Sequence, residues 1–380
     1  MPLRLLLIGA SADLYGSDKV LLDVVQALAE HCEISVALPA HGPLLTKLQR
    51  HRVSVLVMDD FAMRKRDLSP TGALRWIVRV RRSFRELAAL HRRRGFDVVY
   101  SNTLAVPLGA LLRWRLHIPH VWHVHEVLQE PRWFARALSW VVRMESDRVV
   151  CVSGSVRIQL ESLQPKIAAK SSVVYNAVAL PSQGALVRTA RRTDNLVIGS
   201  IGRIYPRKGH RLLLEALALA RQRGFECFLR IFGSALPGAE SHVSSLIEVA
   251  NELKLGDATE FCGFVDDPER IYAGIDVLVL PSIEPEALPL ACLEAQAWGL
   301  PVIAPNEGGP TEIVVDNETG ILVPPRDLEA LADAIELMAR EPGIRRRLGS
   351  AGRQRVADLF DQGHFRQTIS VLVESALDQT

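Results

Sequence analysis

The chain has 380 residues, of which 45 are Lys or Arg and 43 are Asp or Glu, so its net charge at pH 7 is +2. With 48% hydrophobic and 23% charged residues, this composition excludes a disordered or fibrous protein, and no apolar run reaches the roughly 18–20 residues of a membrane-spanning helix. The five cysteines are widely spaced and form no C-x-x-C pair, which argues against a disulfide framework or a zinc site and is typical of a reducing cytoplasm.

The first half of the chain alternates short apolar runs with longer helical segments. Each run is rich in Val, Ile or Leu and nearly continuous, which favours parallel strands covered on both faces. The first run is expected to be a buried strand rather than a secretion signal, because it is short and lacks a cleavage site. The expected strands are Arg4–Gly9, Ile34–Leu38, Val53–Met58, Asp97–Ser101, His120–Val124 and Arg148–Val152, and the expected helices include Lys19–Glu30 and Leu74–Leu90.

A basic segment occupies residues 64–94, where only Asp67 and Glu86 are acidic. Clustered cations on an amphipathic helix favour a surface that binds an anionic membrane. The alternative is a helix that packs its apolar side on the sheet and leaves its basic side in water. No nucleic-acid motif accompanies the cluster, so no nucleic-acid partner is expected. The apolar side recurs at helical spacing as Trp76, Val80, Phe84 and Leu87.

Residues Ala177–Asn195 interrupt the alternation with Pro, Gly and polar residues, which predicts an interdomain linker. Strands and helices then resume in the same order as before. The expected strands are Leu196–Ser200, Phe228–Phe232, Glu260–Gly263, Val277–Pro281, Pro301–Ala304 and Gly320–Val323. The expected helices are Gly209–Arg223, His242–Leu253, Leu290–Trp298, Leu328–Arg340 and Phe365–Leu377.

This repeated pattern predicts an α/β protein made of two Rossmann-like, doubly wound domains, at 1–178 and 196–362. A C-terminal helix within 363–380 is expected to pack back toward the first domain. Residues 1–180 carry 25 basic and 15 acidic side chains, whereas 181–380 carry 20 and 28, so the halves are expected to face different partners. Since parallel sheets bind ligands at the carboxyl ends of their strands, the site is expected in a central cleft between the domains.

A first motif places Gly202-Arg203 and Lys208-Gly209 after an expected strand and at the start of an expected helix. Two cations beside a helix N-terminus suit a diphosphate, which accepts hydrogen bonds from backbone amides and charged donors. The alternative is a pair of surface cations. The P-loop spacing is absent, so ATP hydrolysis is not expected.

A second motif carries two glutamates, Glu286 in the loop before the expected helix Leu290–Trp298 and Glu294 about a turn inside it. A carboxylate can accept hydrogen bonds from two neighbouring hydroxyls of a ribose or hexose, and amides at 288–290 can meet phosphate. The alternative is that one glutamate caps the helix and the other is solvated.

A third motif contains Gly308-Gly309 after the expected strand Pro301–Ala304. Paired glycines allow backbone to approach a ligand closely, and the alternative is a tight turn.

Together these motifs resemble the GT4 family of retaining glycosyltransferases, which has the GT-B fold. The matching patterns are G-R-x-x-x-x-K-G, P-S-x-x-x-E-x-L-P-L-x-x-x-E-A and G-x-P-V-I-A-x-x-x-G-G-x-x-E, and they cover nearly all of residues 196–340. The first half matches more loosely, through Tyr15–Asp18, Val124–Glu126, Cys151–Ser153 and Tyr175–Val178.

The resemblance implies a role for each matching residue of the second half. Arg203 and Lys208 resemble the pair that holds the donor diphosphate. Glu294 resembles the residue that binds the nucleotide ribose, and Glu286 the first glutamate of the E-x7-E motif, near the transferred sugar. The donor-binding segment between these glutamates includes Leu288, Pro289 and Leu290.

In the first half, His125 resembles the active-site histidine that contacts the sugar, and Gly16 resembles the glycine loop near donor and acceptor. The chain departs from the family pattern at Glu126, where Asp is frequent. His123 is a second candidate histidine, and Glu284 is a second candidate for the first glutamate, although its spacing to the next glutamate is less suitable than that of Glu286.

The implied reaction is transfer of a hexose, with retention of configuration, from a UDP- or GDP-sugar to an acceptor hydroxyl. No D-x-D pattern occurs, so neither a metal nor another cofactor is expected. The acceptor is expected to be a polyprenyl-linked oligosaccharide of cell-surface polysaccharide synthesis, or else a soluble metabolite. The protein is accordingly expected in the cytoplasm, at the inner face of the membrane.

Three rival functions remain. A nucleotide-sugar epimerase or hydrolase can share this architecture. A nicotinamide-dependent oxidoreductase is disfavoured because G-x-G-x-x-G is missing after the first strand, and an inactive binding protein because the cations and glutamates are all present.

Overall fold

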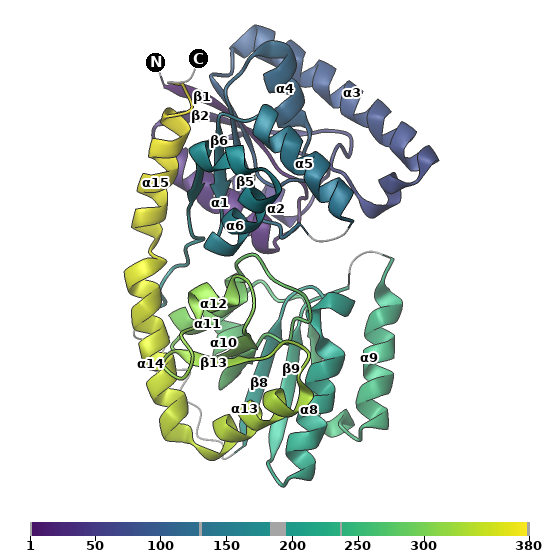
Figure 1. The fold of residues 1–380 in the computed structure, drawn as a ribbon, viewed down its shortest axis with the longest axis vertical. Helices are drawn as coiled ribbons and strands as arrows, with labels where there is room; N and C mark the ends of the chain where they lie inside the picture. Colours follow the sequence, from purple (N-terminus) through teal and green to yellow (C-terminus); the bar gives the residue numbers. More distant parts are fainter. Residues whose placement is uncertain (1, 129–130, 183–194, 236–237, 378–380) are drawn as a thin grey trace. The chain divides into compact units, whose positions relative to one another are not determined.

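The computed structural model describes residues 2–128, 131–182, 195–235 and 238–377, which fall into two units (Figure 1). Unit 1 contains residues 1–176 and 363–380, and unit 2 contains residues 177–362. The C-terminal segment therefore belongs to the same unit as the first half of the chain. Residues 183–194 of the predicted linker lie outside the described part.

Unit 1 is built on seven parallel strands in the order β3-β2-β1-β4-β5-β6-β7. The apolar run near the start is β1, in which Leu5, Leu6, Leu7 and Ile8 are all fully buried, as in a strand covered on both faces. The strands are β1 (Leu3–Ile8), β2 (Cys32–Leu38), β3 (Ser54–Val57), β4 (Val98–Ser101), β5 (His120–Val124), β6 (Arg148–Cys151) and β7 (Ser171–Val173).

Helices cover both faces of this sheet. Crossovers between parallel strands are right-handed, so the direction of travel across the sheet decides which face a helix covers. The chain moves from β1 to β3 through α1 and α2, and from β3 back across to β7 through α3, α4, α5 and α6, so these last four share one face. The helices are α1 (Gly16–Leu28), α2 (Pro43–Leu48), α3 (Pro70–Arg94), α4 (Leu108–Leu116), α5 (Arg132–Met144), α6 (Gly154–Leu163) and α15 (Gln362–Glu374).

The apolar stripe of the basic segment faces the sheet. Val80 and Leu87 are buried in the core, and Trp76 and Phe84 pack against it. The indole nitrogen of Trp76 also donates a hydrogen bond of 3.0 Å to the carbonyl of Phe61. This stripe therefore packs α3 on its own unit, and any contact with a membrane has to use other side chains.

Part of the positive charge of the same segment is compensated within unit 1. Arg79 pairs with the buried Asp67 at 2.8 Å, and Arg82 pairs with Asp59 at 2.7 Å. Arg66 pairs with Asp60 at 2.5 Å.

Unit 2 is built on six parallel strands in the order β10-β9-β8-β11-β12-β13. The two sheets with their interleaved helices confirm the prediction of two Rossmann-like, doubly wound α/β units. The strands are β8 (Leu196–Ile201), β9 (Cys227–Phe232), β10 (Thr259–Gly263), β11 (Val277–Val279), β12 (Val302–Pro305) and β13 (Gly320–Val323). The helices are α8 (His210–Gln222), α9 (Glu240–Glu252), α10 (Pro268–Tyr272), α11 (Leu290–Ala297), α12 (Pro310–Ile313), α13 (Leu328–Arg340) and α14 (Pro342–Leu359).

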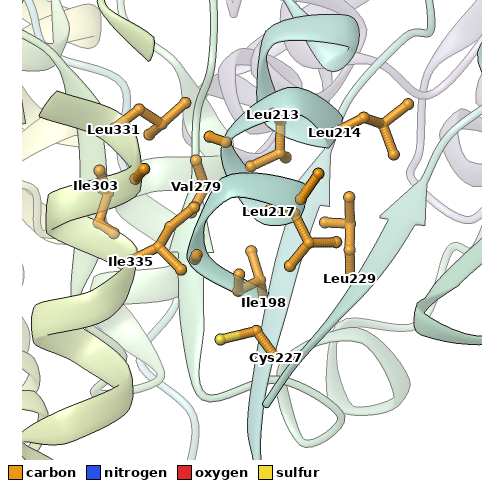
Figure 2. Close-up of a cluster of buried hydrophobic side chains, with 14 of the residues drawn as sticks. Ile198, Leu213, Leu214, Leu217, Cys227, Leu229, Val279, Ile303, Leu331 and Ile335 are labelled. Carbon is orange, nitrogen blue, oxygen red and sulfur yellow. The ribbon is translucent and has the colours of Figure 1, made fainter. Parts of the chain in front are cut away.

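The core of unit 2 lies between the sheet and the helices α8 and α13 (Figure 2). Leu213 and Leu217, one turn apart on α8, and Ile335 of α13 meet the strand residues Ile198 and Ile303 in one buried cluster. This packing holds the N-terminus of α8 at the carboxyl edge of the sheet, where the candidate site begins.

Helix α14 is an element that the sequence analysis missed. Its two interior glycines, Gly349 and Gly352, weaken the helical signal, because glycine costs about 1 kcal/mol in a helix interior. A Cβ atom on Gly349 would lie 1.9 Å from the carbonyl oxygen of Gly299, and one on Gly352 would lie 3.0 Å from Gln296 Cγ. The glycines therefore allow α14 to pack tightly against α11.

Several predicted boundaries differ from the observed ones, as at α3 and α15, where the observed helices begin four and three residues earlier than predicted, and two others differ for identifiable reasons. The strand expected to end at Pro281 ends at Val279, since proline has no amide hydrogen with which to continue the ladder. The helix expected from Gly209 begins at His210, because Gly209 is its N-cap with a φ of +67°.

Candidate active site

In unit 2, the predicted phosphate-binding loop connects β8 to α8 and packs on the loop that follows β11. Gly202 (φ +149°) leaves the strand, Lys208 ends a short 3-10 turn, and Gly209 (φ +67°) leads into α8. A Cβ atom on Gly209 would lie 1.9 Å from the carbonyl oxygen of Pro281. Only glycine fits between the two loops, and their contact brings the Lys208 ammonium to the second motif.

Lys208 and Glu286 form a largely buried ion pair, with Nζ 2.6 Å from Oε1 and side-chain exposures of 17% and 20%. The Ser282 hydroxyl donates a hydrogen bond of 2.5 Å to the same carboxylate oxygen. Burial by itself raises the pKa of the Glu286 carboxyl, but Lys208 outweighs this effect and holds the pKa below its usual range. Burial likewise lowers the pKa of Lys208, and Glu286 outweighs it, so the pKa is raised and both groups are charged at neutral pH.

Glu284 and Glu286, the two candidates for the first glutamate of the motif, have different partners. Glu284 pairs with Arg207, with Nε 3.2 Å from Oε2, and the Arg207 guanidinium lies 5.5 Å from the centre of the Tyr205 ring. Arg203 is half-buried directly after Gly202, at the carboxyl end of β8. Lys208 therefore contacts Glu286, and Glu284 has a different partner.

Helix α11 carries the second glutamate. Glu294 lies in its second turn and accepts a hydrogen bond of 2.6 Å from the hydroxyl of Tyr272, whose buried ring stacks on Trp298 at 6.0 Å. The N-cap of α11 is Pro289, and no side chain caps it, so the alternative in which a glutamate caps the helix is wrong. Because proline has no N–H, Leu288 and Leu290 are the only amide donors of the predicted 288–290 segment.

The glycine pair of the third motif packs against the second motif. The Gly309 amide donates a hydrogen bond of 2.8 Å to the Glu286 carbonyl. A Cβ atom on Gly308 would lie 2.7 Å from that carbonyl oxygen, and one on Gly309 would lie 2.0 Å from the Ala287 oxygen. These glycines therefore serve a close contact between two loops, which holds the backbone around Glu286 in place.

In unit 1, the predicted His125 and the newly found Asn102 lie at the carboxyl edge of the sheet, where β1, β4 and β5 end side by side. His125 directly follows β5, and Asn102 directly follows β4. The Asn102 amide nitrogen donates a hydrogen bond of 2.7 Å to the Ser17 carbonyl in the first turn of α1, and its oxygen lies 3.1 Å from His125 Nε2. Asn102 therefore connects the start of α1 to the candidate histidine.

This connection determines the tautomer of His125. The Ser17 carbonyl can only accept, so the amide nitrogen of Asn102 faces Ser17 and its oxygen faces the imidazole. Nε2 of His125 must then carry the hydrogen, and Nδ1 is the basic nitrogen. Burial lowers the pKa of His125 to about 3, so the ring is neutral at physiological pH.

The neighbouring His123 differs from His125 in its burial and in its hydrogen-bond partner. His123 is fully buried inside β5, and its Nδ1 lies 2.7 Å from the Tyr100 hydroxyl. The ring centres of His123 and His125 are 4.1 Å apart. Only His125 is partly exposed, which supports it as the histidine that can reach a ligand.

Gly16 has a different setting from the one expected, and Glu126 has a structural role. Gly16 is the first residue of α1 rather than part of a loop, and a Cβ atom there would meet nothing within 4 Å. Glu126 accepts hydrogen bonds from the Thr103 hydroxyl and the Leu104 amide, and burial raises the pKa of its carboxyl. Glu126 therefore holds the segment after β4.

The structure thus brings Arg203, Lys208 and Glu286 to the carboxyl edge of unit 2, with Glu294 on the adjoining helix, and His125 and Gly16 to the carboxyl edge of unit 1. Sequence analysis missed Asn102, Ser282 and Tyr272. A polar residue directly after a strand, as in Ser101-Asn102-Thr103, was the available signal for the first of these.

Two protein-family models match the chain. Residues 186–355 match the model described as glycosyl transferases group 1, and residues 15–180 match the model described as glycosyltransferase family 4. A D-inositol 3-phosphate glycosyltransferase of Kribbella flavida is 31% identical over 280 residues, which are 67% of this chain and 66% of the relative. A glycogen synthase of Mycobacterium tuberculosis is 29% identical over 278 residues, 70% of this chain and 65% of the relative. The chain thus spans about two thirds of the length of these relatives.

The fold has a solved counterpart in HepE of Anabaena, crystallised with UDP and glucose. It superimposes with a TM-score of 0.84 over 98% of this chain and 100% of HepE, at 23% sequence identity.

Proposed function

Because this chain belongs to the family 4, group 1 glycosyltransferases and has their GT-B fold, we propose that it transfers a hexose from a UDP- or GDP-sugar to an acceptor hydroxyl. The observation that carries this proposal is the Lys208–Glu286 ion pair at the carboxyl edge of unit 2, on the loop that also carries Arg203. Residues 196–362 would bind the nucleotide sugar, and residues 1–178 the acceptor.

The two cations would act on the leaving group. When the bond between the sugar and the diphosphate breaks, negative charge grows on the phosphate oxygens while the sugar becomes oxocarbenium-like. Lys208 uses one N–H for Glu286 and retains others for a phosphate oxygen, and Arg203 offers a planar set of donors. Such preorganised donors typically lower the barrier by several kcal/mol, about 3 for one donor.

The carboxylates and amides of the second motif would hold the rest of the donor. Glu294 would bind the ribose hydroxyls, and Glu286 would lie near the transferred sugar. The amides of Leu288 and Leu290 are available at the start of α11, where an anion is favoured by the helix dipole.

Unit 1 would contribute His125. In its neutral form with hydrogen on Nε2, the ring presents Nδ1 as an acceptor for a sugar hydroxyl. A neutral ring also avoids repulsion with the positive charge that develops on the sugar. Gly16, at the open start of α1, would leave room for donor or acceptor.

For the chemical route, we propose transfer with retention and without a metal. The acceptor hydroxyl would attack from the face that the leaving group departs from, forming the new C–O bond as the old one breaks, and its proton would pass to the leaving phosphate. The absence of a D-x-D pattern from the sequence supports a role for Arg203 and Lys208 in place of a metal.

As acceptor we propose a polyprenyl-linked oligosaccharide of cell-surface polysaccharide synthesis, with a soluble metabolite as the alternative. A lipid-linked acceptor requires access to a membrane, and the basic segment 64–94 would face its anionic cytoplasmic leaflet. Among the described residues, no helix combines the length and the apolar character that crossing a membrane requires.

Product analysis tests the proposed function against its rival. Purified protein is incubated with each of a panel of UDP- and GDP-sugars, with and without lipid-linked acceptor extract. A transferase releases nucleoside diphosphate at a substantial rate only when acceptor is present. An epimerase or hydrolase converts the donor alone at the same rate, and that result would reject the proposal.

A further inference from the structure

Three neighbouring helices of unit 1 turn large apolar side chains outward. The helices α3, α4 and α5 follow one another on one face of the sheet (Figure 1). Single exposed apolar residues are ordinary, but a group of them on adjacent helices marks an interaction surface. The exposed residues are Leu74, Ile77 and Val78 on α3, Trp114 on α4, and Trp133, Trp140 and Met144 on α5.

Helix α5 is the clearest case, because both of its tryptophans point away from the protein. Its fully buried residues are Ala135, Ser139 and Val142, all of small or moderate size. Trp133 and Trp140, two turns apart on the opposite side, keep 71% and 51% of their surface exposed. A helix that needs only its own unit buries its largest apolar side chains, so this reversed arrangement indicates a partner.

The charge of the three helices identifies the kind of partner. Together they contain 13 Arg and one acidic residue, Glu86. Arg79, Arg82 and Arg113 form ion pairs with aspartates outside these helices, so the net charge of the three helices and these partners remains strongly positive. On α5 the exposed Arg132 and Arg136 flank the tryptophans, and on α4 the Arg115 guanidinium lies 4.1 Å from the centre of the Trp114 ring. A second copy of the chain would bring this positive surface against itself, which disfavours a dimer.

Tryptophan beside arginine is typical of a membrane interface. The indole ring prefers the headgroup level, where its apolar body is buried and its N–H stays hydrated, and arginine is attracted to anionic headgroups. We propose that α3, α4 and α5 form a lipid-docking surface that inserts Trp114, Trp133 and Trp140 at the headgroup level of an anionic bilayer. The biological role of this surface rests on the lipid-linked acceptor proposed above, but the binding of the surface to lipid requires no sugar transfer.

This surface differs from the one expected from the sequence. The stripe of Trp76, Val80, Phe84 and Leu87 is packed on the sheet, and Arg79 and Arg82 are engaged in ion pairs. The lipid contacts would instead come from the outer side of α3 and from two helices outside segment 64–94.

Vesicle flotation tests the proposal with the full-length protein. We expect binding to vesicles of equal amounts of phosphatidylglycerol and phosphatidylcholine, and at least about tenfold weaker binding to phosphatidylcholine alone. Trp133→Ala/Trp140→Ala should weaken binding to the anionic vesicles by about tenfold or more, because it removes the inserted rings. The control Ile247→Ala/Val371→Ala removes exposed apolar side chains from α9 and α15 and should leave binding unchanged.

Two further measurements separate the possible outcomes. Brominated lipid should quench tryptophan fluorescence in the wild type and less in the Trp133→Ala/Trp140→Ala variant, whose circular dichroism should match the wild type. Equal flotation of the wild type and this variant, or no binding to anionic vesicles, would overturn the proposal. So would a wild-type dimer in sedimentation velocity that the variant converts to monomer. Donor conversion without vesicles is measured in parallel, so a failure of membrane binding is distinguished from a failure of the proposed transfer.

Discussion

Lys208 and Glu286 lie 78 residues apart in the sequence, and their side chains form an ion pair with Nζ 2.6 Å from Oε1. The pair joins the loop after β8 to the loop after β11, which are neighbouring strands of unit 2. Both charges are largely removed from water, so each depends on the other. The pair therefore couples the stability of unit 2 to the groups that are proposed to bind the donor.

Replacing Lys208 alone should destabilise unit 2 as well as abolish transfer. Lys208→Met leaves the Glu286 carboxylate buried without a counter-charge, which we expect to cost about 2–3 kcal/mol in the free energy of unfolding, less than for a fully buried pair. The double variant Lys208→Met/Glu286→Gln removes both charges and should recover most of that loss in urea denaturation while staying inactive. If the double variant is no more stable than the single one, the two charges are not coupled as described.

Arg203 and Arg207 provide a matched comparison, since they lie four residues apart on the same loop. Arg203→Ala should lower the transfer rate about 100-fold or more, as expected when one donor to the leaving group is lost. Arg207 is engaged with Glu284 and Tyr205 and is half-exposed, so Arg207→Ala should change the rate only a few-fold. Steady-state assays that rank the two variants in the opposite order would reassign the diphosphate contact.

Asn102 should act as a positioning residue for His125. In the wild type, long-range proton–nitrogen NMR spectra of histidine-labelled protein should identify the hydrogen on Nε2. Asn102→Leu removes the acceptor, so a mixture of tautomers should appear, and kcat should fall about tenfold with little change in KM for the donor. A wild-type spectrum with the hydrogen on Nδ1 would contradict the hydrogen-bond assignment whatever the kinetics.

The buried histidines of unit 1 should make stability depend on pH. Burial lowers the pKa of His120 to about 3 and that of His123 well below its usual value, so both stay neutral in the folded state. Below about pH 6.5 the unfolded chain binds protons that the folded chain does not, so each such histidine removes about 1.4 kcal/mol per pH unit from the free energy of unfolding as pH falls.

Chemical denaturation between about pH 7 and pH 5 measures this slope. His120→Gln should be less stable at pH 7, because it loses contacts to Ser101 and Glu145, but its stability should fall less steeply with pH. The same slope in the wild type and the variant would mean that His120 is protonated in the fold.

Much of the fold could be predicted because continuous apolar runs such as Leu5–Ile8 have few structural alternatives. Every strand predicted from such a run is present in the described residues. Helix α14 was missed because Gly349 and Gly352 weaken the local helical pattern. These glycines allow close contacts with Gly299 and with Gln296 of α11, which are distant in sequence. The boundary at Pro281 was wrong by two residues because proline cannot continue the ladder, and the boundary at Gly209 by one residue because this glycine is the N-cap of α8.

Only those residues of the candidate site that occur in recognisable sequence motifs could be predicted. Arg203, Lys208, Glu286 and Glu294 stand out because they occur in compact motifs beside strands. Other contacts depend on loops that meet only in the folded protein, and the spacing of residues in the sequence does not predict them. These are the Lys208–Glu286 ion pair, the hydrogen bond from Ser282 to Glu286 and the hydrogen bond from Tyr272 to Glu294. The outward side of α5 was hidden for the same reason, since periodicity does not say which face of a helix meets the sheet.

Calorimetric titration with UDP, UMP, GDP and GMP measures whether Arg203 and Lys208 bind the donor diphosphate. One nucleoside diphosphate should bind the wild type at least about tenfold more tightly than its monophosphate, and Lys208→Met/Glu286→Gln should lose this preference. If that variant discriminates diphosphate from monophosphate as well as the wild type does, the group that binds the second phosphate is not Lys208 and lies elsewhere in the protein.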